Sequence, residues 1–157
     1  MSSFGQQTLT TVGRSPKVSA DGCPEVKQIG VTIDWALVAA VSGADVTLDD
    51  GVTIKIGEKY LRYGQVLCMV SATGKYAPYD FAASNGQETC RAGECFVLNS
   101  TVKENDMKSD HAGVAIYGGP VWKARLKATA GTHSLANGPT YTELLAALPR
   151  LQLFIDA

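Results

Sequence analysis

Short segments of alternating apolar and polar residues, separated by glycine or proline, constrain the fold of this chain more than any other feature. In Val31-Thr-Ile-Asp-Trp-Ala-Leu37 the apolar residues occupy the odd positions, as in a strand with one face toward a core. Segments 46–48 and 52–56 flank Asp49-Asp50-Gly51, and Asp-Gly supplies the positive φ angles of a tight hairpin turn. Many short strands at such spacing predict a barrel or a sandwich.

Four later segments also have the length and composition of short strands. They span residues 65–70, 95–98, 114–117 and 121–126, and Gly118-Gly119-Pro120 is expected to separate the last two. The sequence therefore predicts a mainly β protein whose strands are connected by glycine- and proline-containing turns.

One helix is predicted near the C-terminus. Thr140 and Glu143 have the spacing of a capping box, in which each side chain accepts a hydrogen bond from the backbone N–H of the other residue. Pro149 is expected to end the helix, and residues 151–155 to form a closing strand. The predicted apolar face of the helix consists of Tyr141, Leu144, Leu145 and Leu148.

Residues 1–28 differ from the rest of the chain. They are rich in Ser, Thr, Gln, Gly and Pro and show no sustained hydrophobic period, which indicates an extended arm. One interpretation is a disordered terminus. The other is a segment that orders on a partner, with Phe4 and Leu9 as anchors and residues 8–12 as an added strand. We expect two units, an arm of residues 1–28 and a β-rich domain of residues 29–157.

Charge and hydropathy argue against a nucleic-acid or membrane partner. The 14 basic and 15 acidic residues give a net charge of −1 without a long run of either sign, so no phosphate-binding surface is predicted. No stretch approaches the roughly 18 consecutive apolar residues that span a bilayer, and the first residues do not resemble a signal peptide. We expect the chain to fold in the cytosol.

The four cysteines, at positions 23, 68, 90 and 95, are expected to be free thiols. Persistent disulfides are uncommon in a reducing compartment. The spacing of Cys90 and Cys95 is compatible with zinc, but Cys23 and Cys68 do not form the second close pair of a typical zinc motif. We therefore predict small buried apolar side chains, with no metal and no cofactor.

Neither an enzyme site nor a carrier lysine is predicted. Ser109-Asp110-His111 has the residue types of a triad, but triad members meet through the fold rather than as neighbours, so we interpret it as a solvated loop. Gly64 and the apolar strand after it resemble part of a biotinyl or lipoyl domain. The neighbours of Lys75 are Gly74 and Tyr76, which differ from those of a modified lysine, so Lys75 is interpreted as a turn residue.

Three turn-rich segments follow one another in a characteristic order. They are Lys59-Tyr-Leu-Arg-Tyr-Gly-Gln-Val-Leu67, Thr73-Gly-Lys-Tyr-Ala-Pro-Tyr-Asp80 and Ala82-Ala-Ser-Asn-Gly-Gln87. In this order they resemble the lambda-type head decoration proteins of tailed bacteriophages. The resemblance continues through the later strands and the helix at 140–148, and residues 29–56 form a longer region than small members of that family need.

The resemblance implies a small β-barrel or β-tulip-like domain with a short C-terminal helix and an extended N-terminal arm. It also implies a homotrimer, made in the bacterial host cytoplasm, that binds the outer surface of the expanded virion head and stabilises it against DNA pressure. The arm would contact the major capsid protein through Phe4, Thr8, Leu9, Thr10, Thr11 and Val12. Candidate trimer contacts are Tyr76, Tyr79, Phe81 and Trp122, for which the alternative is packing inside the barrel, the interpretation we favour for Trp122.

Two other classes remain open from the sequence. One is another virion barrel, such as a tail or baseplate component. The other is a carbohydrate-binding module, because aromatic residues gather between Tyr76 and Phe81.

Overall fold

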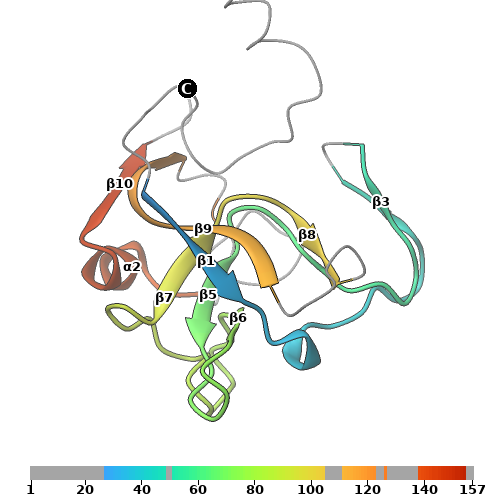
Figure 1. Ribbon diagram of the computed structural model, residues 1–157, viewed down its shortest axis with the longest axis horizontal. Coiled ribbons are helices and arrows are strands. Elements are labelled where there is room, and N and C mark those ends of the chain that lie inside the picture. Colours follow the sequence, from blue (N-terminus) through green and yellow to red (C-terminus); the bar gives the residue numbers. More distant parts are fainter. Residues whose placement is uncertain (1–26, 49–50, 105–110, 123–125, 127–137, 155–157) are drawn as a thin grey trace, which may run out of the picture.

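A computed structural model describes residues 27–48, 51–104, 111–122, 126 and 138–154 (Figure 1). The predicted arm contacts Phe4 and 8–12 lie outside the described residues. The elements in chain order are β1 (Lys27–Thr32), the 3-10 helix η1 (Trp35–Leu37), β2 (Val46–Thr47), β3 (Thr53–Ile54), β4 (Tyr60–Leu61), β5 (Val66–Met69), β6 (Tyr76–Pro78), β7 (Cys95–Leu98), β8 (Val102–Lys103), β9 (His111–Trp122), α2 (Tyr141–Ala147) and β10 (Arg150–Phe154).

A six-stranded sheet forms the centre of the fold. Its strands follow the order β1-β9-β7-β5-β6 in antiparallel pairs, and β10 adds to β9 in parallel. Just after β1, Ile33 bridges to Tyr76 of β6, and the Asp34 N–H donates to the Tyr76 carbonyl at 2.8 Å. Because this bridge joins the two edges, the sheet curls into a barrel-like form. The predicted mainly β, barrel-like fold with one short C-terminal helix is confirmed.

The longest strand, β9, differs from the prediction. Segments 114–117 and 121–126 were expected to be separate, yet β9 continues from His111 to Trp122 through the Gly-Gly-Pro sequence. At Gly118 the strand lies opposite Lys27 of β1 and also Arg150 of β10, and beyond it β10 is the partner. The strand therefore changes partner at Gly118 instead of turning, and Gly119 adopts a φ of 101°, which favours glycine. His111 lies in β9 opposite Thr32, so the prediction that it lies in a loop was wrong, and Ser109 and Asp110 lie outside the described residues.

The segment from Val31 to Leu37 begins as the predicted strand and ends as a helical turn. The side chains of Val31, Ile33 and Trp35 are buried, as the alternation predicted, but Leu37 is 40% exposed. The strand stops because the chain turns at Asp34, whose carbonyl accepts from the Leu37 N–H at 3.1 Å. Residues Trp35–Leu37 are thus a 3-10 helix rather than the end of a strand.

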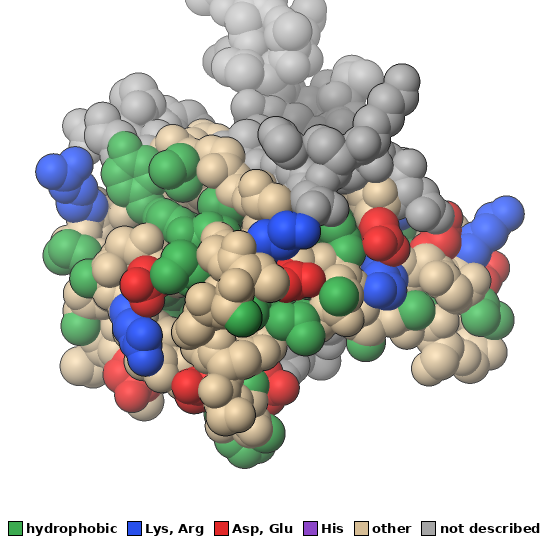
Figure 2. Space-filling model, turned by 60° about the horizontal axis from the view of Figure 1, so that its bottom comes forward, with side chains coloured by type: hydrophobic (Ala, Val, Ile, Leu, Met, Phe, Trp, Pro, Cys, Tyr) green, Lys and Arg blue, Asp and Glu red, His purple; other side chains and the backbone are tan. Residues whose placement is uncertain are grey.

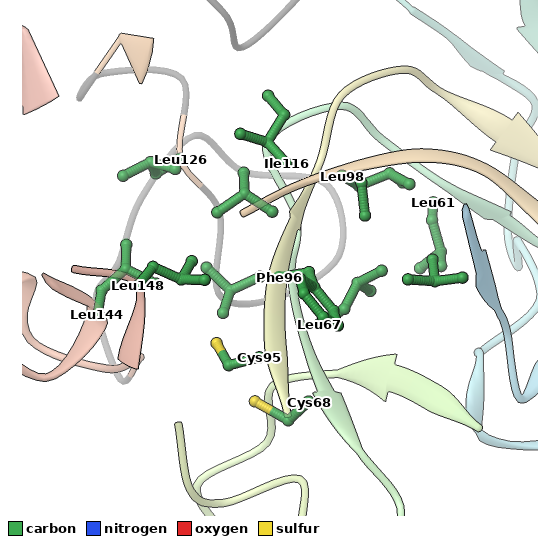
Figure 3. Close-up of a cluster of buried hydrophobic side chains, with 14 of the residues drawn as sticks. Leu61, Leu67, Cys68, Cys95, Phe96, Leu98, Ile116, Leu126, Leu144 and Leu148 are labelled. Atoms are coloured by element: carbon green, nitrogen blue, oxygen red, sulfur yellow. The ribbon is translucent and has the colours of Figure 1, made fainter. Parts of the chain in front are cut away.

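The main core joins side chains of the large sheet with those of η1, β4 and α2 (Figure 3). The capping box is present: the Glu143 N–H donates to the Thr140 hydroxyl at 3.2 Å, and the Thr140 N–H donates to the Glu143 carboxylate at 2.7 Å. This cap fixes the start of α2, so that Leu144 and Leu148 face the core, whereas Leu145 is exposed despite its predicted position on the apolar face. The largest buried side chains of this core include Leu61, Leu67, Leu98, Ile116 and Leu144.

A second, smaller core supports the hairpin of β2 and β3, which we call the hairpin lobe (residues 41–60). Val41, Leu48 and Ile54 are buried there. The predicted hairpin is confirmed, although each strand has only two residues. Gly51 has a φ of 83°, as the Asp-Gly turn requires, and the Leu48 N–H donates to the Val52 carbonyl at 2.8 Å. In Figure 1 this hairpin extends away from the large sheet, on the side opposite α2.

Candidate interaction surfaces

Two of the predicted trimer contacts, Tyr76 and Tyr79, are half-buried and pack against the main core. The Tyr76 ring lies 5.2 Å from the Phe96 ring, measured between centroids, at a tilt of 56°. Burial raises the pKa of both tyrosine hydroxyls, with smaller contributions from nearby acidic groups. Both rings therefore stabilise the barrel, and a role of their exposed edges in a trimer stays a prediction.

The third predicted contact, Phe81, is 60% exposed. It lies in the loop of residues 79–94 that follows β6, next to Asp80. The carboxylate of Asp80 accepts from the Ala82 N–H at 3.0 Å, and its carbonyl accepts from the Ala83 N–H at 3.1 Å. These bonds hold a tight turn that presents the Phe81 ring to solvent, where it is available for contact with another protein.

The fourth predicted contact, Trp122, lies at a different place in the sheet. It is the last residue of β9, with Phe154 of β10 as its neighbour. Two strands, β7 and β5, separate β9 from β6, which carries Tyr76. The structure therefore groups Tyr76, Tyr79 and Phe81 at the β6 edge and places Trp122 elsewhere.

The loop of residues 79–94 is fastened to the barrel by polar contacts. The buried Gln87 side chain donates to the Pro78 carbonyl at 2.8 Å, and the Ser71 N–H donates to the Asn85 carbonyl at 2.8 Å. Gly86 packs so closely that a Cβ there would overlap the backbone oxygen of Met69. The loop thus lies against β5 and β6 in one defined position.

The structure contains an apolar groove of about 480 Å³ that the sequence did not predict. It lies where β1, β9 and the end of α2 meet, three elements far apart in the chain, so no local pattern could have revealed it. In the view of Figure 2, hydrophobic side chains gather on the left, the side where Figure 1 places α2 and β10. Its lining includes Ile29, Phe96, Tyr117, Ala147, Leu148 and Pro149.

Lys75 follows Gly74 in the turn between β5 and β6 and is half-buried. Its carbonyl accepts from the Val70 N–H at 2.8 Å, and its N–H donates to the Thr73 hydroxyl at 3.2 Å. This geometry agrees with the interpretation of Lys75 as a turn residue, because a carrier lysine needs an exposed hairpin tip.

Cys90 and Cys95, which the sequence analysis considered as a pair, lie together with Cys68 in the structure. Their Sγ atoms all lie within 4.8 Å of one another, with Cys90 3.0 Å from Cys95 and 3.9 Å from Cys68. Hydrogen bonds from the other two thiols lower the pKa of Cys90 to about 4, against the opposing effects of burial and Glu143. The hydrogen bond with Cys90 raises the pKa of Cys68, against the lowering effect of its bond with Cys95, and burial raises it further. Hydrogen bonds with Cys68 and then with Cys90 raise the pKa of Cys95. All three are free thiols, as predicted, and Cys68 and Cys95 are buried.

No helix among the residues placed by the structure is long and apolar enough to cross a membrane.

Comparison with known protein families identifies a matching family. The family described as bacteriophage lambda head decoration protein D matches residues 37–147, from the last residue of η1 to the last residue of α2. This is more than half of the 157-residue chain, and it begins earlier than the motifs between Lys59 and Gln87 that first indicated the resemblance. No curated protein and no solved structure matches the chain.

Proposed function

The chain belongs to the family of the bacteriophage lambda head decoration protein D, and from that premise we propose that it binds the expanded phage capsid as a trimer and stabilises it. Membership supports a role as a structural protein of the virion head. The finer proposal is that three copies bind together on the outer surface, contact the major capsid protein and strengthen the head against the pressure of its DNA. The family match over residues 37–147 is the observation that carries this proposal.

The position of β1 supports a role for the preceding residues in capsid contact. Strand β1 begins at Lys27 and is an edge strand of the large sheet. The 26 residues before it can span at most roughly 90 Å when fully extended. A segment of this reach can contact a neighbouring capsid subunit and add a strand to it, with Phe4 and Leu9 as apolar anchors.

Trimer formation would increase the affinity for the capsid without any additional contact in the individual subunits. When three arms belong to one assembly, binding of the first raises the effective concentration of the other two at their sites. Weak individual contacts then give slow release of the whole trimer. The exposed Phe81 ring is the best placed of the predicted subunit contacts, because Tyr76 and Tyr79 are largely committed to the core.

Cosedimentation with expanded, DNA-free capsids tests the proposal. We expect the full-length protein to sediment with the capsids in a saturable manner. A variant lacking residues 2–22, which leaves β1 intact, should keep the fold by circular dichroism and lose most of its binding. Absence of binding by the full-length protein, or its binding to purified tails instead, would overturn the proposed function. Binding only to glycans on an array would favour the carbohydrate-binding alternative.

A matched pair of surface variants tests the predicted subunit contact. Phe81 is 60% exposed and Ile56, in the hairpin lobe, is 57% exposed, so Phe81→Ser and Ile56→Ser remove similar exposed apolar surface. We expect Phe81→Ser to lower the amount of capsid-bound protein at a given concentration and Ile56→Ser to leave it unchanged. Equal effects of the two changes would exclude a specific role of Phe81.

A further inference from the structure

Two of the clustered cysteines occupy facing positions on adjacent strands. Cys68 of β5 is the register partner of Cys95 of β7. The Met69 N–H donates to the Glu94 carbonyl directly beside this pair, and the Leu98 N–H donates to the Gln65 carbonyl further along the same two strands, both at 2.9 Å. Cys68 and Cys95 therefore form a non-hydrogen-bonded pair, the kind in which facing side chains lie closest. Figure 3 shows both sulfur atoms directed to the same side of the two strands.

The third cysteine, Cys90, comes from the loop of residues 79–94. The contacts of Gly86 and Gln87 with β5 and β6 hold this loop in place. They bring the Cys90 Sγ to 3.0 Å from Cys95 and 3.9 Å from Cys68. Three separate parts of the chain thus supply one thiol each to a single point.

The surroundings of this point favour a cation. A cavity of about 190 Å³ opens beside Cys90, and Glu88 and Glu143 both line it. Thiols lose their protons when they bind a metal ion, and two carboxylates beside the resulting thiolates favour a divalent cation at this point.

We propose that Cys68, Cys90 and Cys95 bind a Zn²⁺ ion, with the fourth coordination position facing the cavity lined by Glu88 and Glu143. In a tetrahedral site with Zn–S bonds of about 2.3 Å, neighbouring sulfur atoms lie ~3.8 Å apart. The Cys68–Cys90 distance of 3.9 Å already fits. The Cys90–Cys95 distance of 3.0 Å must widen by ~0.8 Å, and the cavity beside the half-buried Cys90 gives its side chain room to move.

Zinc at this position would connect the loop of residues 79–94 to two strands of the barrel. Cys68 and Cys95 belong to β5 and β7, whereas Cys90 belongs to the loop that also presents Phe81. Metal binding would therefore stabilise the loop in the same position that its polar contacts already define. This inference concerns the metal alone and does not depend on capsid binding.

Metal analysis of the full-length protein tests the proposal. Protein produced in zinc-supplemented medium and purified without chelators should contain about one zinc per chain, and Cys90→Ser should reduce this to near zero. Cys90 lies on a loop, so the variant should keep the circular dichroism spectrum of the barrel. Replacing zinc by Co²⁺ should give a near-ultraviolet thiolate-to-cobalt absorption band that Cys90→Ser weakens. Removal of zinc by a chelator should lower the melting temperature of the unaltered protein and leave that of Cys90→Ser unchanged.

Cys23→Ser is the matched control, because it removes a thiol from outside the described residues; it should keep its zinc. Three results would overturn the proposal. The first is zinc-free protein with no gain in melting temperature on addition of Zn²⁺. The second is zinc that is retained by Cys90→Ser. The third is a zinc-free Cys23→Ser variant whose intact mass is lower by two hydrogens, which would show a disulfide among Cys68, Cys90 and Cys95.

Discussion

The barrel core and the hairpin lobe are both apolar cores, but they are assembled in different ways. The barrel core joins side chains from positions far apart, such as Leu67, Ile116 and Leu144, which are all fully buried. The core of the lobe consists of Val41, Leu48 and Ile54, with two partly buried neighbours. Contacts between residues far apart in the chain must overcome the entropy cost of closing long loops. The two strands of the lobe are joined by one tight turn, so their contacts close only a short loop.

This difference indicates which part of the molecule determines global stability. The large sheet can form only when β1, β7 and β9 are all in place, so its core should unfold as one unit. The lobe has few buried apolar contacts and can open on its own. The lobe lies within the family match of residues 37–147, and the barrel core overlaps it.

The largest effect is expected for Ile116→Ala. Ile116 is fully buried in β9 between β1 and β7, and removing its side chain leaves a cavity in the main core. We expect a loss of about 4 kcal/mol in the free energy of unfolding, measured by urea denaturation. A loss below about 1 kcal/mol would show that the barrel core does not dominate stability.

The next largest effect is expected for Gly86→Ala. Gly86 has a φ of 108°, and a Cβ there would overlap the Met69 carbonyl oxygen, so the substitution adds backbone strain and a clash. We expect a loss of about 3 kcal/mol. Gly51→Ala in the lobe is the matched control, since Gly51 has a φ of 83° but open space around it, and should cost about 1 kcal/mol. Equal costs in urea denaturation would mean that the loop can move away from β5.

An intermediate and local effect is expected for Ile54→Ala. Ile54 is fully buried, but its core has few members, so we expect a loss of about 2 kcal/mol. Amide hydrogen exchange should show faster exchange in residues 41–60 and unchanged protection in β5, β7 and β9. Faster exchange throughout the barrel would contradict the separation of the two cores.

A smaller effect is expected at the start of α2, which packs on the barrel core. Thr140→Ala removes the hydroxyl that accepts from the Glu143 N–H, and should cost about 1 kcal/mol in urea denaturation. The exposed change Leu145→Ala in the same helix should cost less. A larger loss of stability for Leu145→Ala than for Thr140→Ala would show that the capping box does not contribute to stability.

The smallest effect concerns pH. Hydrogen bonds from the Thr140 backbone and then its hydroxyl lower the pKa of Glu143 below its usual value. The stabilisation is therefore fully present above the pKa of the unfolded chain and is lost as the pH falls through the lower folded value. Glu143→Gln should flatten the acid side of the plot of unfolding free energy against pH. An unchanged plot would show that Glu143 does not contribute to the loss of stability at low pH.

The sequence predicted well those elements that depend on neighbours in the chain. Strand β7 is found at the predicted residues 95–98. The capping box of Thr140 and Glu143 is present, and Gly51 has the positive φ predicted for the turn before β3. Each of these follows from the chemistry of a few adjacent residues.

The features that the sequence did not predict depend on distant partners. Gly118 was expected to separate two strands, but β10 pairs with β9 there and β9 continues as one strand. The groove needs β1, β9 and α2 together. Cys68 and Cys95 meet only because β5 pairs with β7 in one register, which spacing along the chain cannot show.

The most direct test of the central claim is cryo-electron microscopy of expanded, DNA-free capsids incubated with a saturating concentration of the full-length protein. We predict clusters of three copies on the outer surface at the threefold and quasi-threefold positions, each cluster in contact with the major capsid protein. Capsids that remain bare at saturating protein, or copies bound singly at other positions, would contradict the account.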